Sequence, residues 1–430
     1  MNIDATPAKE APEIGELFAA FGRIGLLSFG GPAAQIALMH RVLVDEKRWL
    51  SERRYLNALS FCMLLPGPEA MQLATYAGWR LKGLWGGLMA GLLFVLPGAA
   101  VILALAGLYA YFGSVPLMAA LFLGIKAAVV IIVIEALLKV ARRALKKMIY
   151  WIIAALAFIG IFFLALPFPL IVFAAALFGF FWRDETHESE TLPAVRKTAP
   201  LQTALTIALG LVIWWAPVLL IDQLSETPIL TEIALFFSKL AVVTFGGAYA
   251  VLAYMAQDVV VSFGWLNAGQ MMDGLGLAET TPGPLILVTE FVGFLAAFRE
   301  GGFLLGLAGA ALTLWVTFVP CFLWIFAGAP YIDRISNQPR LAGALNAITA
   351  AVVGVILNLS LWFALHVFFT EVTMREAGPL TLWQPMLASF DARVLALALI
   401  SGFLLLYRHW PITPVLLVAA AGGVALDYLV

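Results

Sequence analysis

Three short motifs occur twice in this sequence of 430 residues, in the same order and at the same spacing. The first copies are Phe29-Gly30-Gly31, Trp49-Leu50 and Pro66-Gly67-Pro68, and the second are Phe245-Gly246-Gly247, Trp265-Leu266 and Pro282-Gly283-Pro284. Each motif is separated from its copy by 216 residues. Random apolar sequence does not keep one register over about forty residues, so the chain contains a duplicated unit of roughly 200 residues.

The composition assigns the duplicated unit to a membrane. The chain is 63% hydrophobic and 12% charged, which is too little polar surface for a soluble globule. Many apolar runs are near 20 residues long, the length of a membrane-spanning helix. The net charge of −1 gives no reason to expect a nucleic-acid partner. Cys62 and Cys321 lie in apolar runs and are expected to be packing residues. Four scattered histidines have no metal-ligand spacing, so we expect neither a metal nor a cofactor.

We expect the chain to contain two repeats and a connection between them. Residues 1–182 are expected to form the first repeat, 183–229 a polar linker with a connecting span, and 230–430 the second repeat. The first residues have more acid than base and are expected to form a cytoplasmic tail rather than a signal peptide. Pro97 and Pro320 are 223 positions apart, so seven residues are inserted in the second copy, near residues 299–309.

The charges of two equivalent loops predict that the halves are inverted. The loop at 40–54 contains five Lys and Arg residues, and its counterpart at 256–270 contains none. Positive residues mark the cytoplasmic side, so the two loops are expected on opposite sides of the membrane. The predicted fold is therefore an all-α polytopic membrane protein with two homologous, inverted halves and broken helices. We favour re-entrant hairpins at the Phe-Gly-Gly and Pro-Gly-Pro segments over full spans, because hairpins keep almost every Lys/Arg cluster inside. Ser51 is expected to cap the helix that follows the first loop.

The sequence resembles the chromate ion transporter family. The resemblance lies in Ser28-Phe29-Gly30-Gly31-Pro32, His40, Trp49-Leu50, Pro66-Gly67-Pro68 with Gly78, and Leu96-Pro97-Gly98. It extends over both repeats, so the chain is similar to the long two-domain form. The resemblance implies export of chromate across a bacterial inner membrane, driven by an ion gradient and giving chromate resistance, with sulfate as the look-alike oxyanion. The second copy has no Pro after Gly247 and has Ala256 at the position of His40, which leaves equal binding by both halves open.

The broken helices are the expected substrate site. Chromate and sulfate are tetrahedral dianions, and helix N-termini offer free amides and a favourable dipole for such anions. Inversion would bring four such ends together at the bilayer midplane. The expected substrate-binding residues are Ser28, Phe29, Gly30, Gly31, Pro32, Gln35, Pro66, Gly67, Pro68, Gln72, Thr244, Phe245, Gly246, Gly247, Thr281, Pro282, Gly283 and Pro284. The alternative is that these glycines and prolines only permit kinks and close helix packing.

Five charged residues are candidates for charge compensation or coupling, namely Arg23, Lys239, Lys126, Glu69 and Glu290. Arg23 and Lys239 are equivalent in the repeat and could neutralise the dianion or gate its access, or they could reach to lipid headgroups instead. Lys126 is a candidate substrate charge. Carboxyl groups in lipid can carry protons, which makes Glu69, Glu279 and Glu290 coupling candidates, with a proton as the expected coupling ion. For Glu69 the alternative is stabilisation of the helix dipole.

We expect a secondary active transporter and no enzyme. Its partners are then chromate or sulfate, membrane lipid and the coupling ion, in a monomer or a homodimer. Uptake of sulfate or another oxyanion by the same fold is the alternative, and the residues leave direction, anion preference, stoichiometry and the number of spans open. Broken helices also leave a passive channel open. An intramembrane enzyme acting on a lipid phosphate would need a polar cluster, and no His or second Asp accompanies Asp273 and Glu279.

Overall fold

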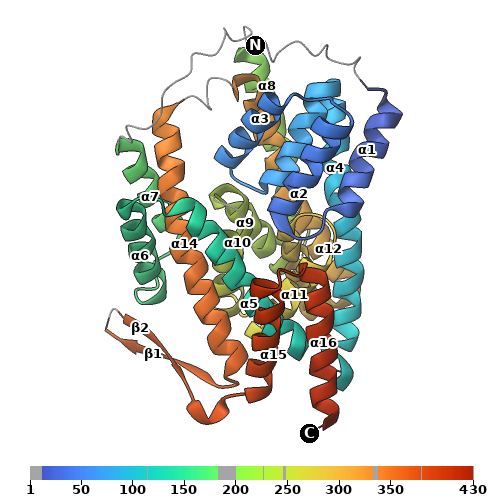
Figure 1. Ribbon diagram of the computed structural model, residues 1–430. Coiled ribbons are helices and arrows are strands. Elements are labelled where there is room, and N and C mark those ends of the chain that lie inside the picture. Colours follow the sequence, from blue (N-terminus) through green and yellow to red (C-terminus); the bar gives the residue numbers. More distant parts are fainter. Residues whose placement is uncertain are drawn as a thin grey trace.

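A computed structural model describes residues 12–113, 115–182, 200–225, 227–245, 248–332, 338–378 and 380–429. Helices make up almost all of it (Figure 1). The first half contains α1 (Ile14–Leu27), α2 (Gly31–His40), the π-helical turn η1 (Arg41–Glu46), α3 (Glu52–Leu64), α4 (Glu69–Phe112), α5 (Pro116–Ala144), α6 (Met148–Phe162) and α7 (Phe168–Phe181). The connecting helix is α8 (Pro200–Leu224).

The second half repeats this order. It contains α9 (Ile229–Val243), α10 (Ala248–Gln257), η2 (Asp258–Ser262), α11 (Ala268–Thr280), η3 (Leu285–Leu287), α12 (Val288–Gly328), η4 (Ala329–Tyr331) and α14 (Pro339–Phe368). The chain continues with β1 (Val372–Ala377), β2 (Leu380–Pro385), η5 (Leu387–Ser389), α15 (Ala392–Gly402), η6 (Phe403–Tyr407) and α16 (Ile412–Leu429). The π-helical turns η1 and η2 lie at equivalent positions of the two copies.

The Phe-Gly-Gly segment turns the chain between α1 and α2. Gly30 and Gly31 have φ angles of +83° and +78°, a backbone region that glycine adopts at little cost. Pro32 follows in the first turn of α2, where its missing N–H is no loss. Because α1 has 14 residues and rises about 1.5 Å per residue, it is too short for a hydrocarbon core of about 30 Å.

The Pro-Gly-Pro segment forms the turn of a second hairpin in each half. Gly67 and Gly283 have φ angles of +114° and +90°. The helix after each turn breaks again, α4 at Lys82-Gly83 and α12 at Gly301-Gly302, with nearly the same backbone angles in the two copies. Each hairpin therefore consists of short helices, as the re-entrant prediction requires.

The two breaks also correct the predicted position of the insertion. Gly83 and Gly302 are 219 positions apart, compared with 216 for the Pro-Gly-Pro motifs and 223 for the prolines inside α4 and α12. The seven extra residues thus lie on both sides of the break, three before it and four after it, rather than as one block near 299–309. The three residues before the break correspond to the extra turn η3, which the first half does not have between its Pro-Gly-Pro motif and α4.

Equivalent caps begin the second hairpin in both halves. The Ser51 hydroxyl accepts a hydrogen bond from the Arg54 amide at 3.4 Å, which confirms the predicted cap. Asn267 has the same role at the start of α11, where its side chain accepts from the Gln270 amide at 2.8 Å. The Gln270 side chain accepts from the Asn267 amide in return, which completes a capping box.

Five helices of the described chain are long and apolar enough to cross a membrane. They are α4, α5, α8, the run from η3 to η4, and α14. The connecting span that the sequence predicts within 183–229 is α8. Figure 1 shows α3, which follows the 40–54 loop, near the top and α11, which follows the 256–270 loop, in the lower half. This placement is the one expected of inverted halves.

The halves exchange their last helical pairs. Figure 1 shows α6 and α7 beside α14, and α15 and α16 near α5. Glycines permit these close contacts, because a Cβ on Gly179 would collide with the Gly343 carbonyl oxygen and one on Gly124 with that of Ala419. Each half thus supplies a hairpin that covers the long helix of the other half.

One element was not expected from the sequence. Strands β1 and β2 pair as an antiparallel hairpin after α14. The Thr381 amide donates a hydrogen bond of 2.8 Å to the Phe163 carbonyl oxygen, which attaches β2 to the turn between α6 and α7. Apart from this hairpin, the described chain has the predicted all-α class.

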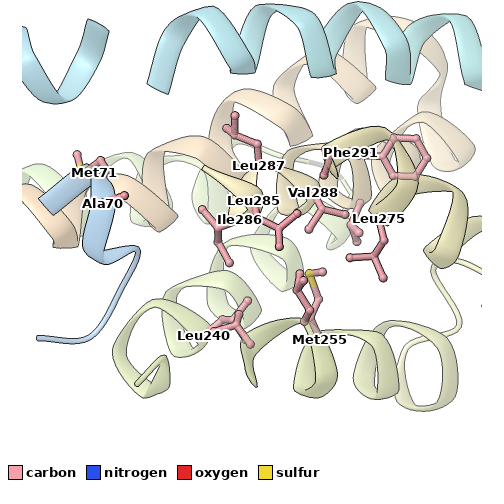
Figure 2. Packing of buried hydrophobic residues seen from close by; sticks show 14 of the residues in the cluster. Ala70, Met71, Leu240, Met255, Leu275, Leu285, Ile286, Leu287, Val288 and Phe291 are labelled. Carbon is pink, nitrogen blue, oxygen red and sulfur yellow. The ribbon is translucent and has the colours of Figure 1, made fainter. Parts of the chain in front are cut away.

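One part of the core lies where the Pro-Gly-Pro hairpin of the second half meets α9 and α10. Figure 2 shows Leu285, Ile286 and Leu287 of η3 in this packing, together with Leu240 and Met255. All five side chains are buried. The three residues that follow Pro-Gly-Pro are therefore held on several sides by apolar contacts.

Candidate functional site

The turns of the two halves meet through a pair of equivalent hydrogen bonds. The Gly283 amide donates to the Ser28 carbonyl oxygen at 2.9 Å, and the Gly67 amide donates to the Thr244 carbonyl oxygen, also at 2.9 Å. Each Pro-Gly-Pro turn thus contacts the Phe-Gly-Gly segment of the opposite half. We call the four segments at 28–31, 66–68, 244–245 and 281–284 the tip crossing. The predicted residues Gly246 and Gly247 lie outside the described residues.

Two equivalent residues of the long helices support the tip crossing. Gly98 packs on the second turn so closely that a Cβ would collide with the Pro282 carbonyl oxygen. Its counterpart in α12 is Cys321, whose Sγ lies 2.8 Å from the position of a Cβ on Gly67. Cys321 is buried, and its thiol donates to the Thr317 carbonyl oxygen at 3.3 Å, so it is a packing residue as expected. Cys62 is buried as well.

The polar side chains predicted to bind substrate are brought together at the tip crossing. Ser28, Gln35, Gln72, Thr244 and Thr281 are all at most 4% exposed. Each donates to a backbone carbonyl oxygen: Ser28 to Ile24 at 2.6 Å, Gln35 to Gly283 at 2.7 Å, Gln72 to Pro66 at 2.7 Å, Thr281 to Ala278 at 3.1 Å, and Thr244 to Leu240. Broken helices in a membrane require such internal partners for their carbonyl groups. An anion can use these donors only by replacing the bonds that they make here.

The apolar residues of the predicted set surround these donors. Pro68 and Pro284 precede helices as their N-cap residues, and Pro66 and Pro282 begin the two turns. Phe29 is 40% exposed, whereas Phe245 is partly buried. Pro32 and the two glycines before it open α2. The described residues of the set therefore lie in the turns or in the helices next to them.

Two buried carboxyl groups lie in the helices around the second turn. Glu279, in the last turn of α11, is 4% exposed and accepts a hydrogen bond from the Tyr249 hydroxyl at 2.8 Å. The Tyr249 hydroxyl also lies 4.0 Å from the position of a Cβ on Gly31. Glu290, in the first turn of α12, is 1% exposed. One oxygen of each carboxyl group has no hydrogen-bond partner in the described chain. Glu69 occupies the first turn of α4, where a carboxylate also favours the helix dipole.

Lys126 forms an ion pair between the halves. Its Nζ atom in α5 lies 3.3 Å from a carboxylate oxygen of Asp273 in α11, and the other Asp273 oxygen accepts from the Tyr109 hydroxyl at 2.7 Å. The Asp273 side chain is 6% exposed and that of Lys126 is 26% exposed. The sequence predicts Lys126 as a candidate substrate charge but does not predict its partner. The available signal was that Asp273 is an acid inside an apolar segment, where charges of opposite sign tend to pair.

The repeat-related cations lie apart from the buried donors. Arg23 is more than half exposed and pairs with Glu46 at 3.1 Å. Lys239 is exposed, and its Nζ lies 5.6 Å from the centre of the Tyr254 ring. Neither forms a hydrogen bond with a residue of the tip crossing in the described chain. Their exposure places both side chains outside the group of buried donors.

Two homologous halves, broken helices that meet end to end, and long apolar helices around them define a polytopic membrane transporter fold. Each half by itself matches a known protein family. Residues 15–180 and 231–426 match the chromate transporter family, so the chain belongs to this family.

Several relatives are named transport proteins. The chain is 34% identical over 363 residues to the chromate transport protein of Pseudomonas aeruginosa, which covers 82% of each chain. It is 31% identical over 343 residues to the chromate transport protein of Cupriavidus metallidurans, covering 79% of this chain and 80% of the relative. A probable chromate transport protein of Synechococcus elongatus is 32% identical over 341 residues, covering 78% and 81%. No solved structure matches this chain.

Proposed function

We propose that this protein is a secondary active transporter that exports chromate across a bacterial inner membrane and so gives chromate resistance. The family membership supports chromate as the substrate. The observation that carries the mechanism is the pair of equivalent hydrogen bonds from Gly67 and Gly283 to the opposite half. A site that both halves complete in the same way can open toward either side by movement of one half against the other.

The proposed transporter consists of two units. Residues 1–182 form the first repeat, 183–229 the linker and connecting span, and 230–430 the second repeat. The exchanged hairpins α6–α7 and α15–α16 favour this division, because each hairpin ends one repeat and covers the other. The two repeats then move as bodies that share a tip crossing.

Chromate binds at the tip crossing in this proposal. The Gly67 and Gly283 amides and the side-chain amides of Gln35 and Gln72 donate to carbonyl oxygens here, and a dianion is a stronger acceptor than a carbonyl group. When the turns separate, these donors exchange a carbonyl partner for an oxygen of the anion. The N-termini of α2 and α4 add the favourable ends of two helix dipoles.

A proton is the proposed coupling ion, and Glu279 is its proposed carrier. Export in exchange for protons requires that the proton and the anion occupy the carrier in turn, and a buried carboxyl group near the tip crossing can take up the proton after the anion has left. The Tyr249 hydroxyl lies between Glu279 and the turn at Gly31, so it connects the carboxyl group to the anion site. Glu290 is the second candidate, because it is buried without a partner for one of its oxygens.

Flux in membrane vesicles of defined orientation tests the proposed direction. Inverted vesicles that contain the protein should accumulate radiolabelled chromate, and the accumulation should depend on the proton gradient and be reduced by excess sulfate. The Gly30→Val variant at equal membrane expression serves as the control for non-specific leakage. Uptake in right-side-out vesicles, with none in inverted vesicles, would make the protein an oxyanion permease. Flux that equilibrates without any gradient would indicate a passive channel.

A further inference from the structure

A cavity of about 440 Å³ lies away from the tip crossing. It is enclosed by the turn between α6 and α7, the C-terminal part of α10 with η2, one face of α14, and the β1–β2 hairpin. In Figure 1 the β-hairpin lies below α6 and next to the lower part of α14. None of its lining residues belongs to the tip crossing. We call this cavity the α10 vestibule.

Hydrogen-bond donors face the α10 vestibule from three helices. Trp362 in α14 and Tyr254 in α10 both line it and are 6% exposed. The Trp362 Nε1 atom makes no hydrogen bond in the described chain, whereas the Tyr254 hydroxyl interacts with the Asp258 carboxylate. An indole N–H can only donate, so the partner that Trp362 lacks is an acceptor. Asn358, which is 8% exposed, lines the cavity beside them.

Lys239 supplies a positive charge to the same cavity. Its ammonium group lies 5.6 Å from the centre of the Tyr254 ring, and Lys239 also interacts with the Asp258 carboxylate in the lining of the cavity. Asp258 and Glu376 also line the vestibule and oppose an anion. A mixed charge of this kind makes binding weak. Weak binding is what a passage requires, because an ion must leave the site as readily as it enters.

We propose that the α10 vestibule binds a tetrahedral oxyanion and is a second station on its path. The identity of the oxyanion with the transported one rests on the function proposed above. The donors Trp362, Asn358 and Lys239 take the oxygens of the anion. Helix α10 connects the two places, since Tyr254 lines the vestibule and Tyr249, five residues earlier, lies beside Gly31 of the tip crossing. By inversion the vestibule lies on the side opposite the basic 40–54 loop, which is the exit side for export.

A cysteine placed in the vestibule gives a local test. Ser262 lines the cavity and is exposed, whereas the native Cys62 and Cys321 are buried. The S262C variant in lipid vesicles should react with a polar maleimide, and sulfate should slow the reaction at millimolar concentration. Sulfate is the probe because chromate oxidises thiols. Adding Trp362→Phe, which keeps the ring and removes the N–H, should raise the sulfate concentration for half protection about tenfold, the effect of one hydrogen bond to a charged group.

Trp324→Phe is the matched control. Its Nε1 atom is also without a partner in the described chain, but Trp324 does not line the vestibule, so protection by sulfate should be unchanged. Lys239→Gln, at an exposed position, should weaken protection without affecting folding. Equal protection in the Trp362→Phe and parent proteins would overturn the proposal. Protection by phosphatidylglycerol in detergent, with none by sulfate, would assign the cavity to a lipid phosphate and overturn it as well.

The same vesicles separate this inference from the proposed function. If the S262C protein transports chromate but sulfate does not slow its labelling, the proposed anion site in the vestibule is wrong and the proposed transport function stands. If sulfate slows the labelling but the protein transports neither chromate nor sulfate, the anion site in the vestibule stands and the proposed transport function is wrong.

Discussion

The amide of Gly283 is bonded to the carbonyl oxygen of Ser28 at 2.9 Å, and these residues belong to different repeats. Gly67 and Thr244 make the same bond with the halves interchanged. Each repeat therefore satisfies backbone groups that the other leaves free where its helices break. Neither pair of hairpins is complete by itself, because an unpaired amide or carbonyl group inside a membrane costs several kcal/mol. The tip crossing therefore requires both copies of the duplicated unit.

Gly98→Ala should separate the turns. The added Cβ would collide with the Pro282 carbonyl oxygen, which is backbone and cannot rotate away. We expect chromate flux to fall at least about tenfold and the unfolding temperature to decrease, because overpacking typically costs about 1–3 kcal/mol. Gly107→Ala in the same helix is the control, since its Cβ would meet only Phe303 at 3.5 Å. Equal flux in both variants would contradict a role for this contact.

Gly30→Val tests the conformation of the first turn. Gly30 has a φ of +83°, which a β-branched residue adopts only at a cost of about 1–3 kcal/mol. We expect transport to be lost at unchanged membrane expression. Gly83→Val has a comparable φ of +64° and open space around it, and it lies at the helix break away from the tip crossing. If both variants lose transport equally, Gly30 is needed for folding in general and has no specific role in the anion site.

The Lys126–Asp273 pair should stabilise the contact between the halves. Asp273→Asn leaves a partly buried ammonium group without its carboxylate, and we expect a loss of about 1–3 kcal/mol after allowance for the exposure of Lys126. Replacing Lys126 by Met in the same protein should recover part of that loss, which a double-mutant cycle in thermal unfolding measures. The i,i+4 pair Glu135–Lys139, in which the lysine side chain is exposed, is the control and should contribute no more than about 0.5 kcal/mol. Additive effects at Lys126 and Asp273 would exclude direct coupling.

Glu279→Gln should uncouple transport from protons. The amide keeps an oxygen that can accept from the Tyr249 hydroxyl, but it cannot gain or lose a proton. We expect chromate exchange between the two sides to continue while its dependence on a proton gradient disappears. Tyr249→Phe should weaken the coupling less, since it removes the connection and keeps the carboxyl group. If transport by the Glu279→Gln protein still depends on the proton gradient, Glu279 is not the proton carrier, and Glu290 or Glu69 becomes the candidate.

Reporter tags in the 40–54 and 256–270 loops test the inversion directly. The five positive residues of the first loop place it in the cytoplasm, and the second loop has none. We expect the first tag to be protected from an impermeant reagent in whole cells and the second to react with it. Tags that both react, or are both protected, would contradict inverted halves.

Much of the architecture could be predicted from the residues. The identical spacing of the motifs predicted the two repeats, and the Gly30-Gly31 and Gly67 positions predicted turns, since these glycines adopt positive φ angles. Ser51 was predicted as a cap, and it is one. These features are local, because each depends on a few neighbouring residues and on their backbone preferences.

The contacts of the candidate site could not be predicted in the same way. The polar residues Gln35 and Gln72 were expected to offer free donors, and they bond to carbonyl oxygens instead. The pairs Lys126–Asp273 and Tyr249–Glu279 follow no sequence spacing, since the partners lie on different helices. The β1–β2 hairpin lies outside the repeated motifs, so the duplication does not predict it.

The sequence alone thus determines that this protein is a duplicated membrane protein with broken helices, because apolar length, glycine and proline act over a few residues. Only the tertiary structure decides which broken end meets which. That choice depends on the carbonyl and amide groups that must find partners in an apolar interior, and here each half finds them in the other.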